Sequence, residues 1–545
     1  MPSINDFQQP FYGLHQQGSG AHPKEVTLIV IAWEPRGKGE PPLSASLLED
    51  LFFGTTDSVA HWFEENSQSR YRLDPHPTHP VIGPFLSVYD WPFYWRSRNP
   101  TYVQNRLTPE EWDQNPFKVP PPTDDPHYYV DQNGLAWYLS DEGYIHGHDQ
   151  SWAEAIRAAA NQINFADFDQ NGDGVLTTDE CLIVIVKAQA TNFGTRRPDV
   201  GREVPPPSTD LVVDGVAINP PSRLICELYA APPHGSNDLA VATEEVLHLA
   251  ANLADQYPDG SHRLGSDPRR PGQLALTDAG HRPVHIDPYH KLKWGWLNPK
   301  LADHSGRYTL HDAATTGEAL VIFSPYFGTD EFFILENRWR GNSYDRFRSN
   351  NRQEGLALWH CIQDTQLSSD WARRAIHLRR VDPRLDANGH IQWGLTLLDG
   401  SDLLRGYDLT DDSNPQNLRW NNKMPSRVRI RNISAAGPIM TVDVEVPPHA
   451  GEIIGTEGRI KMVRAHAHGT GYGPADQRLD EDCIITIDSE PGAAFSIDLS
   501  GGNSLIGRKT FELALTALQN QNPIRLEYEA LNAIGGRVVR LIEIH

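Results

Sequence analysis

The sequence predicts an α/β domain, a β-rich region after it and an all-β domain at the C-terminus. Two apolar runs with many β-branched residues, Val26–Trp33 and Leu182–Val186, are short and read as buried strands. Between them, residues 151–165 are rich in alanine and repeat apolar residues at helical spacing. A strand, a helix and a second strand in this order indicate an α/β layer.

Further helices are expected on either side of this layer. Residues 44–66 carry a helical pattern in which Ser58 precedes an apolar stretch, and residues 238–257 predict a helix that ends at a Tyr-Pro-Asp-Gly turn. The segment 188–222 is rich in Pro and Asp and is expected to be a loop.

The pattern changes in the second half of the chain, where helical periodicity largely gives way to alternating strands after about residue 305. Short alternating runs in the tail suit a small β-sandwich, and they lie at 484–487, 495–499, 511–515, 524–528 and 538–542. The expected parts are a flexible N-terminal segment over 1–22, the α/β domain over 23–304, a β-rich extension packed on it over 305–447 and the all-β sandwich over 448–545.

Charge and hydropathy exclude some classes of function. The chain has 545 residues, with 48 Lys and Arg against 71 Asp and Glu and a net charge of -23. This balance repels phosphate backbones, so we expect no nucleic-acid partner. No apolar stretch approaches the roughly 20 residues that a membrane helix needs, so no membrane span is expected. The first residues show no basic stretch followed by an apolar one, so no signal peptide is visible.

One segment meets each requirement of a twelve-residue calcium loop. Gly174 stands where such a loop turns sharply, and Leu176 is its apolar anchor. A strand follows the loop where a sensor protein would have a second helix, so we expect calcium to stabilise the fold and not to act as a switch. The expected oxygen ligands are Asp169, Asn171, Asp173, the carbonyl of Val175, Thr177 and Glu180.

The helix expected over 238–257 contains a second candidate metal site. A helical H-E-x-x-H motif places two imidazoles on one face to bind zinc, with the glutamate between them as the general base. Glu245 and His248 hold the base and second-ligand positions here, but Glu244 stands in the first. By itself, an E-E-x-x-H pattern is no signal of a zinc site, because acidic residues with a His one turn further on are common on solvated helices.

Several ordered motifs give this helix more weight. They are Leu51-Phe-Phe-Gly54, the Ser58-Val helix, residues 169–186, the segment 283–299, the Glu336-Asn-Arg338 strand and the Gly355–His360 strand. With these motifs, over most of residues 25–370, the chain resembles the M6 (immune inhibitor A-like) metallopeptidases. The resemblance implies a zincin-like metallopeptidase domain with a calcium-type loop and a zinc helix.

The same comparison of motifs shows where this chain departs from the family. The family's zinc helix reads H-E-x-x-H-x-x-G-x-x-D and is followed by a Met-turn. Here Glu244 replaces the first His, Ala251 replaces the Gly, and Asp255 stands one place after the expected Asp. Thr277 stands at the Met-turn position. An anionic Glu244 would weaken the Lewis acidity of a zinc ion, and Ala251 favours a helix that continues past the point where the chain should turn back.

These departures leave two functions open. The first is a calcium-stabilised pseudopeptidase that binds a protein or peptide, with zinc-dependent proteolysis lost or impaired. The alternative is an active zinc endopeptidase that uses Glu245 as general base and a variant ligand set of Glu244, His248 and Asp255. Other candidates for the third ligand are His262, His281 and His285. The resemblance implies secretion, whereas the missing signal peptide favours the cytoplasm, so the localisation stays open.

Overall fold

The chain divides into two compact units. The α/β unit comprises residues 11–255 and 275–286, and the β-rich unit comprises residues 1–10, 256–274 and 287–545. The domain boundaries expected near 304 and 447 stay predictions. The computed structural model describes residues 3–8, 24–36, 42–90, 128–130, 136–138, 152–188, 211–218, 225–230, 236–251, 253, 275–279, 282–324, 328–339, 341, 343–347, 354–362, 376–379, 409–412, 418–420, 425–466, 470–473, 478–479, 483–499, 504–532 and 534–544.

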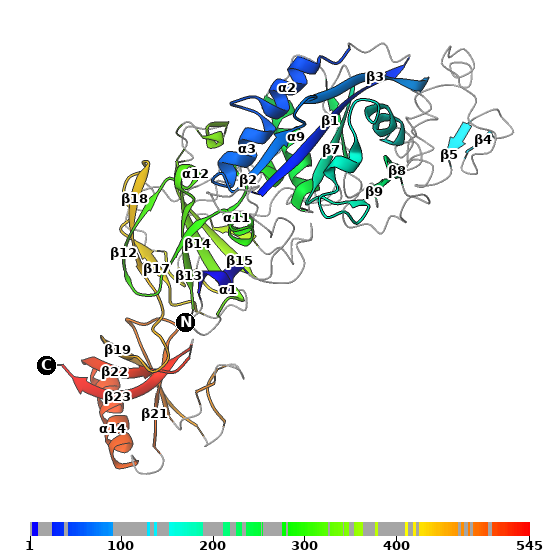
Figure 1. Cartoon of the computed structure of the whole chain (residues 1–545). Helices are drawn as coiled ribbons and strands as arrows, with labels where there is room; N and C mark the ends of the chain where they lie inside the picture. Colours follow the sequence, from blue (N-terminus) through cyan, green and yellow to red (C-terminus); the bar gives the residue numbers. More distant parts are fainter. Residues whose placement is uncertain are drawn as a thin grey trace. The chain divides into compact units, whose positions relative to one another are not determined.

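A parallel sheet lies at the centre of the α/β unit (Figure 1). Its order is β10-β7-β1-β2, and β3 continues along the same side of β1 as a further parallel partner. All eight residues of β7 are buried, which explains why this strand is a continuous apolar run in the sequence. The strands are β1 (Lys24–Arg36), β2 (Tyr71–Pro75), β3 (Val81–Asp90), β7 (Cys181–Ala188) and β10 (Ile225–Ala230).

Helices cover both faces of this sheet. The predicted helix is found over residues 152–159, and Trp152 and Ile156 pack with Ile29 and Ile183 on one face. Alternate side chains such as Leu28 are also buried, on the other face. The pattern over 44–66 forms two helices, with the Ser58 hydroxyl accepting a hydrogen bond from the His61 N–H at the start of the second. The helices are α2 (Ala45–Phe53), α3 (Val59–Asn66), α9 (Ser236–Ala251) and α10 (Leu276–Ala279).

The loop expected over 188–222 contains a hairpin, so that prediction was wrong for residues 211–218. Strands β8 (Leu211–Val213) and β9 (Val216–Ile218) pair antiparallel around Asp214 and Gly215. Both turn residues have positive φ angles, 52° and 84°, as tight hairpin turns require. The smaller elements of this unit are β4 (Tyr128–Val130) paired with β5 (Ala136–Tyr138), the 3-10 helix η1 (Phe165–Phe168), and β6 (Val175–Leu176), which joins β9.

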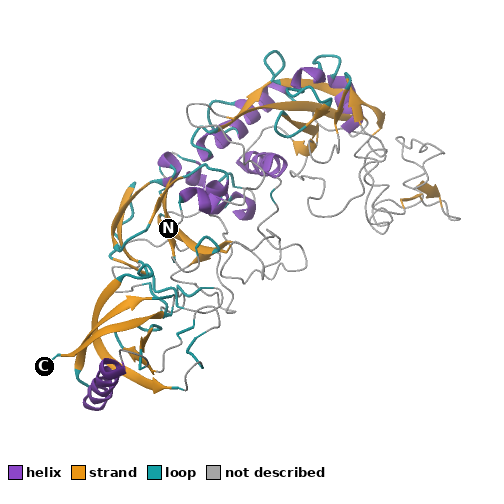
Figure 2. Ribbon diagram, turned by 60° about the horizontal axis from the view of Figure 1, so that its bottom comes forward, coloured by secondary structure: helices purple, strands orange, loops and turns teal. Residues whose placement is uncertain are grey.

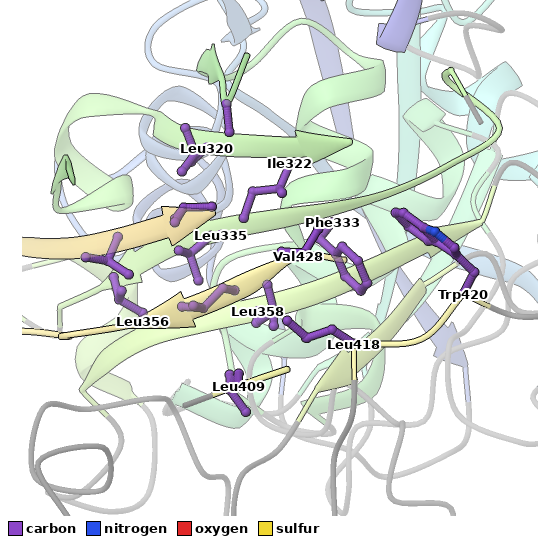
Figure 3. Packing of buried hydrophobic residues seen from close by; sticks show 14 of the residues in the cluster. Leu320, Ile322, Phe333, Leu335, Leu356, Leu358, Leu409, Leu418, Trp420 and Val428 are labelled. Carbon is purple, nitrogen blue, oxygen red and sulfur yellow. The ribbon is translucent and has the colours of Figure 1, made fainter. Parts of the chain in front are cut away.

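The β-rich unit contains the strands that the alternating pattern predicts. One sheet has the order β11-β13-β14-β15-β16 and a second has the order β12-β18-β17. Leu320, Phe333 and Leu358 of the first sheet pack with Trp420 and Val428 in one buried cluster (Figure 3). The elements are α1 (Ile4–Gln8), α11 (Pro288–Lys293), β11 (Asn298–Leu301), β12 (Gly306–His311), α12 (Ala313–Thr316), β13 (Glu318–Phe323), β14 (Glu331–Arg338), η3 (Tyr344–Phe347), β15 (Gly355–Ile362), β16 (Ile376–Arg379), β17 (Arg429–Arg431) and β18 (Ile439–Glu445).

The C-terminal part is a closed barrel with a helix, so the prediction of an all-β sandwich was wrong (Figure 2). The barrel order is β19-β20-β21-β23-β22, with β21 and β23 parallel and the other pairs antiparallel. This order, with a helix between the third and fourth strands, is the topology of an OB-fold. The elements are β19 (Ile453–Ala465), β20 (Cys483–Ile487), β21 (Ala494–Ile497), α14 (Ser504–Asn520), β22 (Pro523–Ala530) and β23 (Gly535–Glu543).

The run 511–515, expected to be a strand, lies inside α14. Its apolar residues alternate over five positions, but the buried residues of the whole segment, Ala514, Ala517 and Gly507, recur at helical spacing. Within the described part of the chain, no helix combines the length and apolar character needed to cross a membrane.

The barrel packs against the β-rich sheets through β20 and β21. Ile484 and Ala494 belong to the buried cluster of Figure 3, whereas Ile485 and Phe495 fill the barrel interior. The guanidinium of Arg427 donates a hydrogen bond of 2.7 Å to the Tyr528 hydroxyl across the same contact. Both sides of β20 and β21 are therefore buried.

Candidate functional site

Helix α9 carries the candidate metal residues, and it is formed where the sequence predicts it. It contacts β7, β10, α3 and α10 within the α/β unit. Residues 239–251 are all buried, as expected of a helix enclosed by a sheet and other helices. The Thr243 hydroxyl donates to the Leu239 carbonyl at 2.6 Å, which satisfies a polar group inside this apolar surrounding.

Glu244 and His248 are four residues apart on α9 and therefore share one face of the helix, with Glu245 beside them. The exposed fractions are 9% for each glutamate and 3% for His248. The three side chains are thus drawn together in a buried setting, where the low dielectric strengthens any interaction with a cation.

His248 is oriented by the backbone that follows the helix. Its Nδ1 lies 2.5 Å from the Leu253 carbonyl oxygen. Because a carbonyl oxygen can only accept a hydrogen bond, Nδ1 carries the proton, and Nε2 of a neutral ring is then the nitrogen able to bind a metal. A backbone carbonyl on the second nitrogen is the usual orienting partner of a metal-binding histidine.

The end of α9 differs from the expected one. The helix ends at Ala251, and Leu253 lies outside it, so the prediction of a helix through residue 257 was wrong at this residue. The alanine in place of glycine at 251 does not prolong the helix, because the carbonyl of Leu253 turns back to His248 and closes its C-terminal end. Asp255, the expected third ligand, lies outside the described residues.

The other candidates for a third ligand divide into two groups. His262 and His281 lie outside the described residues. His285 is buried, and its Nε2 lies 2.5 Å from Oε1 of Glu65 on α3. Its backbone carbonyl accepts a hydrogen bond of 3.1 Å from the Leu276 N–H at the start of α10. The structure therefore places His285 as a link between α3 and the segment 282–286.

Two neighbouring bonds strengthen this link. The indole N–H of Trp62 donates to the Val284 carbonyl at 2.9 Å, and the Ile286 N–H donates to the Asn66 side chain at 3.1 Å. Thr277, at the expected Met-turn position, is fully buried in α10, which contacts α9. Helices α3 and α10 thus form a hydrogen-bonded support beside α9, a role that the sequence alone did not indicate.

Zinc coordination is incomplete among these residues. In the part of the chain that the structure describes, no group of three or more His, Cys, Asp or Glu side chains is arranged to hold a metal ion. Helix α9 could supply one imidazole and two carboxylates, and zinc sites use at least three protein ligands in a tetrahedral arrangement. Three of the further candidate ligands, Asp255, His262 and His281, lie outside the described residues, so zinc binding stays a prediction.

The predicted calcium loop is a compact ring held by bonds between its carboxylates and its own backbone. Its Asp and Glu side chains, which are among the described residues, likewise form no group arranged to hold a metal ion. The carboxylate of Asp169 accepts from the N–H groups of Gly172 and Gly174, each at 2.9 Å. The φ angles of these glycines are 72° and 79°, so the sharp turn does need glycine. Leu176 is buried in the core of the unit, as its predicted anchoring role requires.

Glu180 closes the ring from the opposite end. Its Oε1 accepts from the Gln170 N–H at 3.0 Å, and its Oε2 accepts from the backbone and the hydroxyl of Thr177, both at 2.9 Å. The six predicted ligand positions offer only oxygen atoms, the donors that calcium prefers. Each carboxylate oxygen has two lone pairs, so it can accept an N–H and still bind a cation.

Comparison of the chain with protein-family models, with curated proteins and with solved structures gives no match. Its likeness to a metallopeptidase family, and the roles that this likeness implies for Glu244, Glu245 and His248, therefore remain predictions.

Proposed function

We propose that this chain is a metallopeptidase-like protein of the M6 type with a zincin-like fold, and that its zinc-dependent proteolysis is lost or impaired. In this proposal it is a calcium-stabilised pseudopeptidase that binds a peptide or protein. The observation that carries the proposal is α9, a buried helix on a parallel sheet with Glu245 and His248 at the base and second-ligand positions and Glu244 in place of the first histidine.

The chemistry of α9 supports loss of zinc catalysis. An added carboxylate in place of an imidazole neutralises part of the charge of a zinc ion and raises the pKa of a water bound to it. A hydrolase needs that water ionised near neutral pH. Such a scaffold keeps the buried helix α9 and its supporting hydrogen bonds but does not ionise a zinc-bound water. It is therefore suited to holding a peptide without cleaving it.

Calcium would act on the stability of the fold and not on catalysis. The loop lies between η1 and β7, and β6 within it pairs with β9. A cation bound by the loop would therefore fix the entry to a central strand of the sheet. Such a cation stabilises the folded chain by an amount that depends on its concentration relative to its dissociation constant.

One observation favours the alternative, an active zinc endopeptidase with Glu245 as general base. With its Nδ1 against the Leu253 carbonyl, His248 would bind a metal through Nε2, the arrangement of working zinc sites. In this alternative, Glu244 and Asp255 would supply the remaining ligands.

Metal analysis of the full chain purified without added metal distinguishes the two functions. Calcium without zinc, together with no chelator-sensitive cleavage of casein, is the result expected of the pseudopeptidase. Stoichiometric zinc with chelator-sensitive cleavage that disappears in Glu245→Gln would overturn it in favour of the enzyme.

The variant Glu244→His is the sharper test. We expect it to bind zinc more tightly than the parent chain, because it restores an imidazole one turn before His248. Glu244→Gln is the matched control, since it removes the charge without adding a nitrogen ligand. Equal zinc affinities in all three proteins would mean that the third ligand is missing too.

A further inference from the structure

An asparagine followed directly by a glycine lies in the loop between η1 and β7. Asn171 and Gly172 are both exposed, and apart from the adjoining residues no atom lies within 4 Å of the place where a Cβ on residue 172 would stand. The missing Cβ matters, because a side chain at this position would shield its own backbone nitrogen. The nitrogen of Gly172 is therefore open to the side chain that precedes it.

Two hydrogen bonds hold the Asn171 side chain against the residues that follow it. Its Oδ1 accepts from the Asp173 N–H at 2.8 Å, and its Nδ2 donates to the Asp173 carboxylate at 3.1 Å. A side-chain oxygen bonded to the N–H two residues further on forms an Asx-turn, which folds the amide back along the main chain that it spans. This turn directs Cγ of Asn171 toward the peptide bond that it makes with Gly172.

The bonds of this turn also favour attack on the amide. Oδ1 of Asn171 gains negative charge when a nucleophile adds to Cγ, and the Asp173 N–H is already held at that oxygen to stabilise the charge. The Gly172 N–H donates to Oδ1 of Asp169 at 2.9 Å, which increases the electron density on the Gly172 nitrogen. Closure of a five-membered ring avoids the entropy cost of bringing two molecules together.

We propose that Asn171 is a modification site at which the folded chain deamidates spontaneously. The Gly172 nitrogen bonds to Cγ of Asn171, the Cγ–Nδ2 bond breaks, and Nδ2 leaves as ammonia with the proton of the Gly172 N–H. Water then adds to one of the two carbonyls of the cyclic imide and breaks one of its C–N bonds. Opening at Cγ gives aspartate, and opening at the backbone carbonyl gives isoaspartate. The reaction consumes only water, so it depends neither on a bound cation nor on the function proposed above.

Incubation of the full chain in warm neutral buffer with a chelator tests this proposal, because the chelator keeps cations out of the loop. Each product carries one negative charge more than the parent chain, so we expect a more acidic species to accumulate on ion-exchange chromatography. Tandem mass spectrometry should place the exchange of an amide for an acid at Asn171, with aspartate and isoaspartate both present.

Asn164 is an internal control in the same region. It is also exposed, its Oδ1 accepts from the Ala166 N–H at 3.3 Å, and the N–H of the next residue donates to the Asp214 carboxylate at 2.9 Å. The local bonds thus match those of Asn171, but the next residue is Phe165 and not glycine. Asn164 should therefore deamidate at least about tenfold more slowly than Asn171.

Asn171→Gln is the matched variant, because it keeps an amide but would have to close a six-membered ring. It should not form the acidic species over the same time. A folded parent chain that keeps Asn171 intact, while the same chain unfolded in urea deamidates there, would overturn the proposal, since the loop would then protect its amide. Equal rates at Asn164 and Asn171 would also overturn it.

Discussion

Nε2 of His285 and Oε1 of Glu65 lie 2.5 Å apart and join the segment after α10 to helix α3. This residue is one of the histidines that could have been a zinc ligand. Its ring makes this bond to Glu65. Trp62 and Asn66 form hydrogen bonds with Val284 and Ile286 of the same segment.

Replacing His285 should therefore destabilise the α/β unit. Loss of this buried hydrogen bond in His285→Ala is expected to cost about 1–3 kcal/mol in the free energy of unfolding, measured in urea. His304→Ala is the control, because the side chain of His304 is 74% exposed, and it should change the stability by less than about 0.5 kcal/mol. Unchanged stability together with loss of a bound metal would instead make His285 a ligand.

Calcium should raise the melting temperature of the chain. At a hundred times its dissociation constant, a bound ion adds about 2.7 kcal/mol to the stability of the folded state. Glu180→Gln should abolish this gain, since it removes the charge of the ligand that closes the loop. Asp179→Asn is the matched control: its side chain is 60% exposed and it holds no ligand position. Calorimetry with calcium and with a chelator measures both effects, and an equal response in the two variants would exclude the loop as the site.

The barrel should not bind single-stranded nucleic acid, although its topology is that of an OB-fold. Barrels of this kind bind oligonucleotides on their second and third strands, and here Ile484 and Ala494 on those strands are buried in the cluster of Figure 3. The net charge of -23 also opposes binding. Fluorescence anisotropy with a labelled thymidine oligomer should stay flat at low salt, and a salt-dependent rise would show that the covered face can open.

Hydrophobic pattern predicted the elements that are buried on both sides. Strands β1 and β7 contain continuous apolar runs because the sheet is covered on both faces, and these runs predicted buried strands correctly. The hairpin β8–β9 was missed although its Asp214-Gly215 pair between apolar residues is a strong turn signal. The surrounding segment is rich in Pro and Asp, and this composition favoured the prediction of a loop.

The errors in the tail and at the site have a different cause. A sandwich and a barrel share the same alternating strands, and only the pairing of distant strands, such as β19 with β22, distinguishes them. The role of His285 likewise depends on Glu65, which is 220 residues away. The sequence could suggest a calcium loop because all the proposed ligands are close together along the chain, and calcium binding there stays a prediction. Contacts that form only in the folded chain leave no such local pattern.

The closure of the C-terminal barrel makes its last strand indispensable. Strand β23 pairs with β21 on one side and with β22 on the other. A chain cut short before Gly535 would therefore leave two rows of backbone N–H and C=O groups without neighbours, and such rows recruit strands from other molecules. Loss of the final residues would thus convert a closed barrel into a template for aggregation.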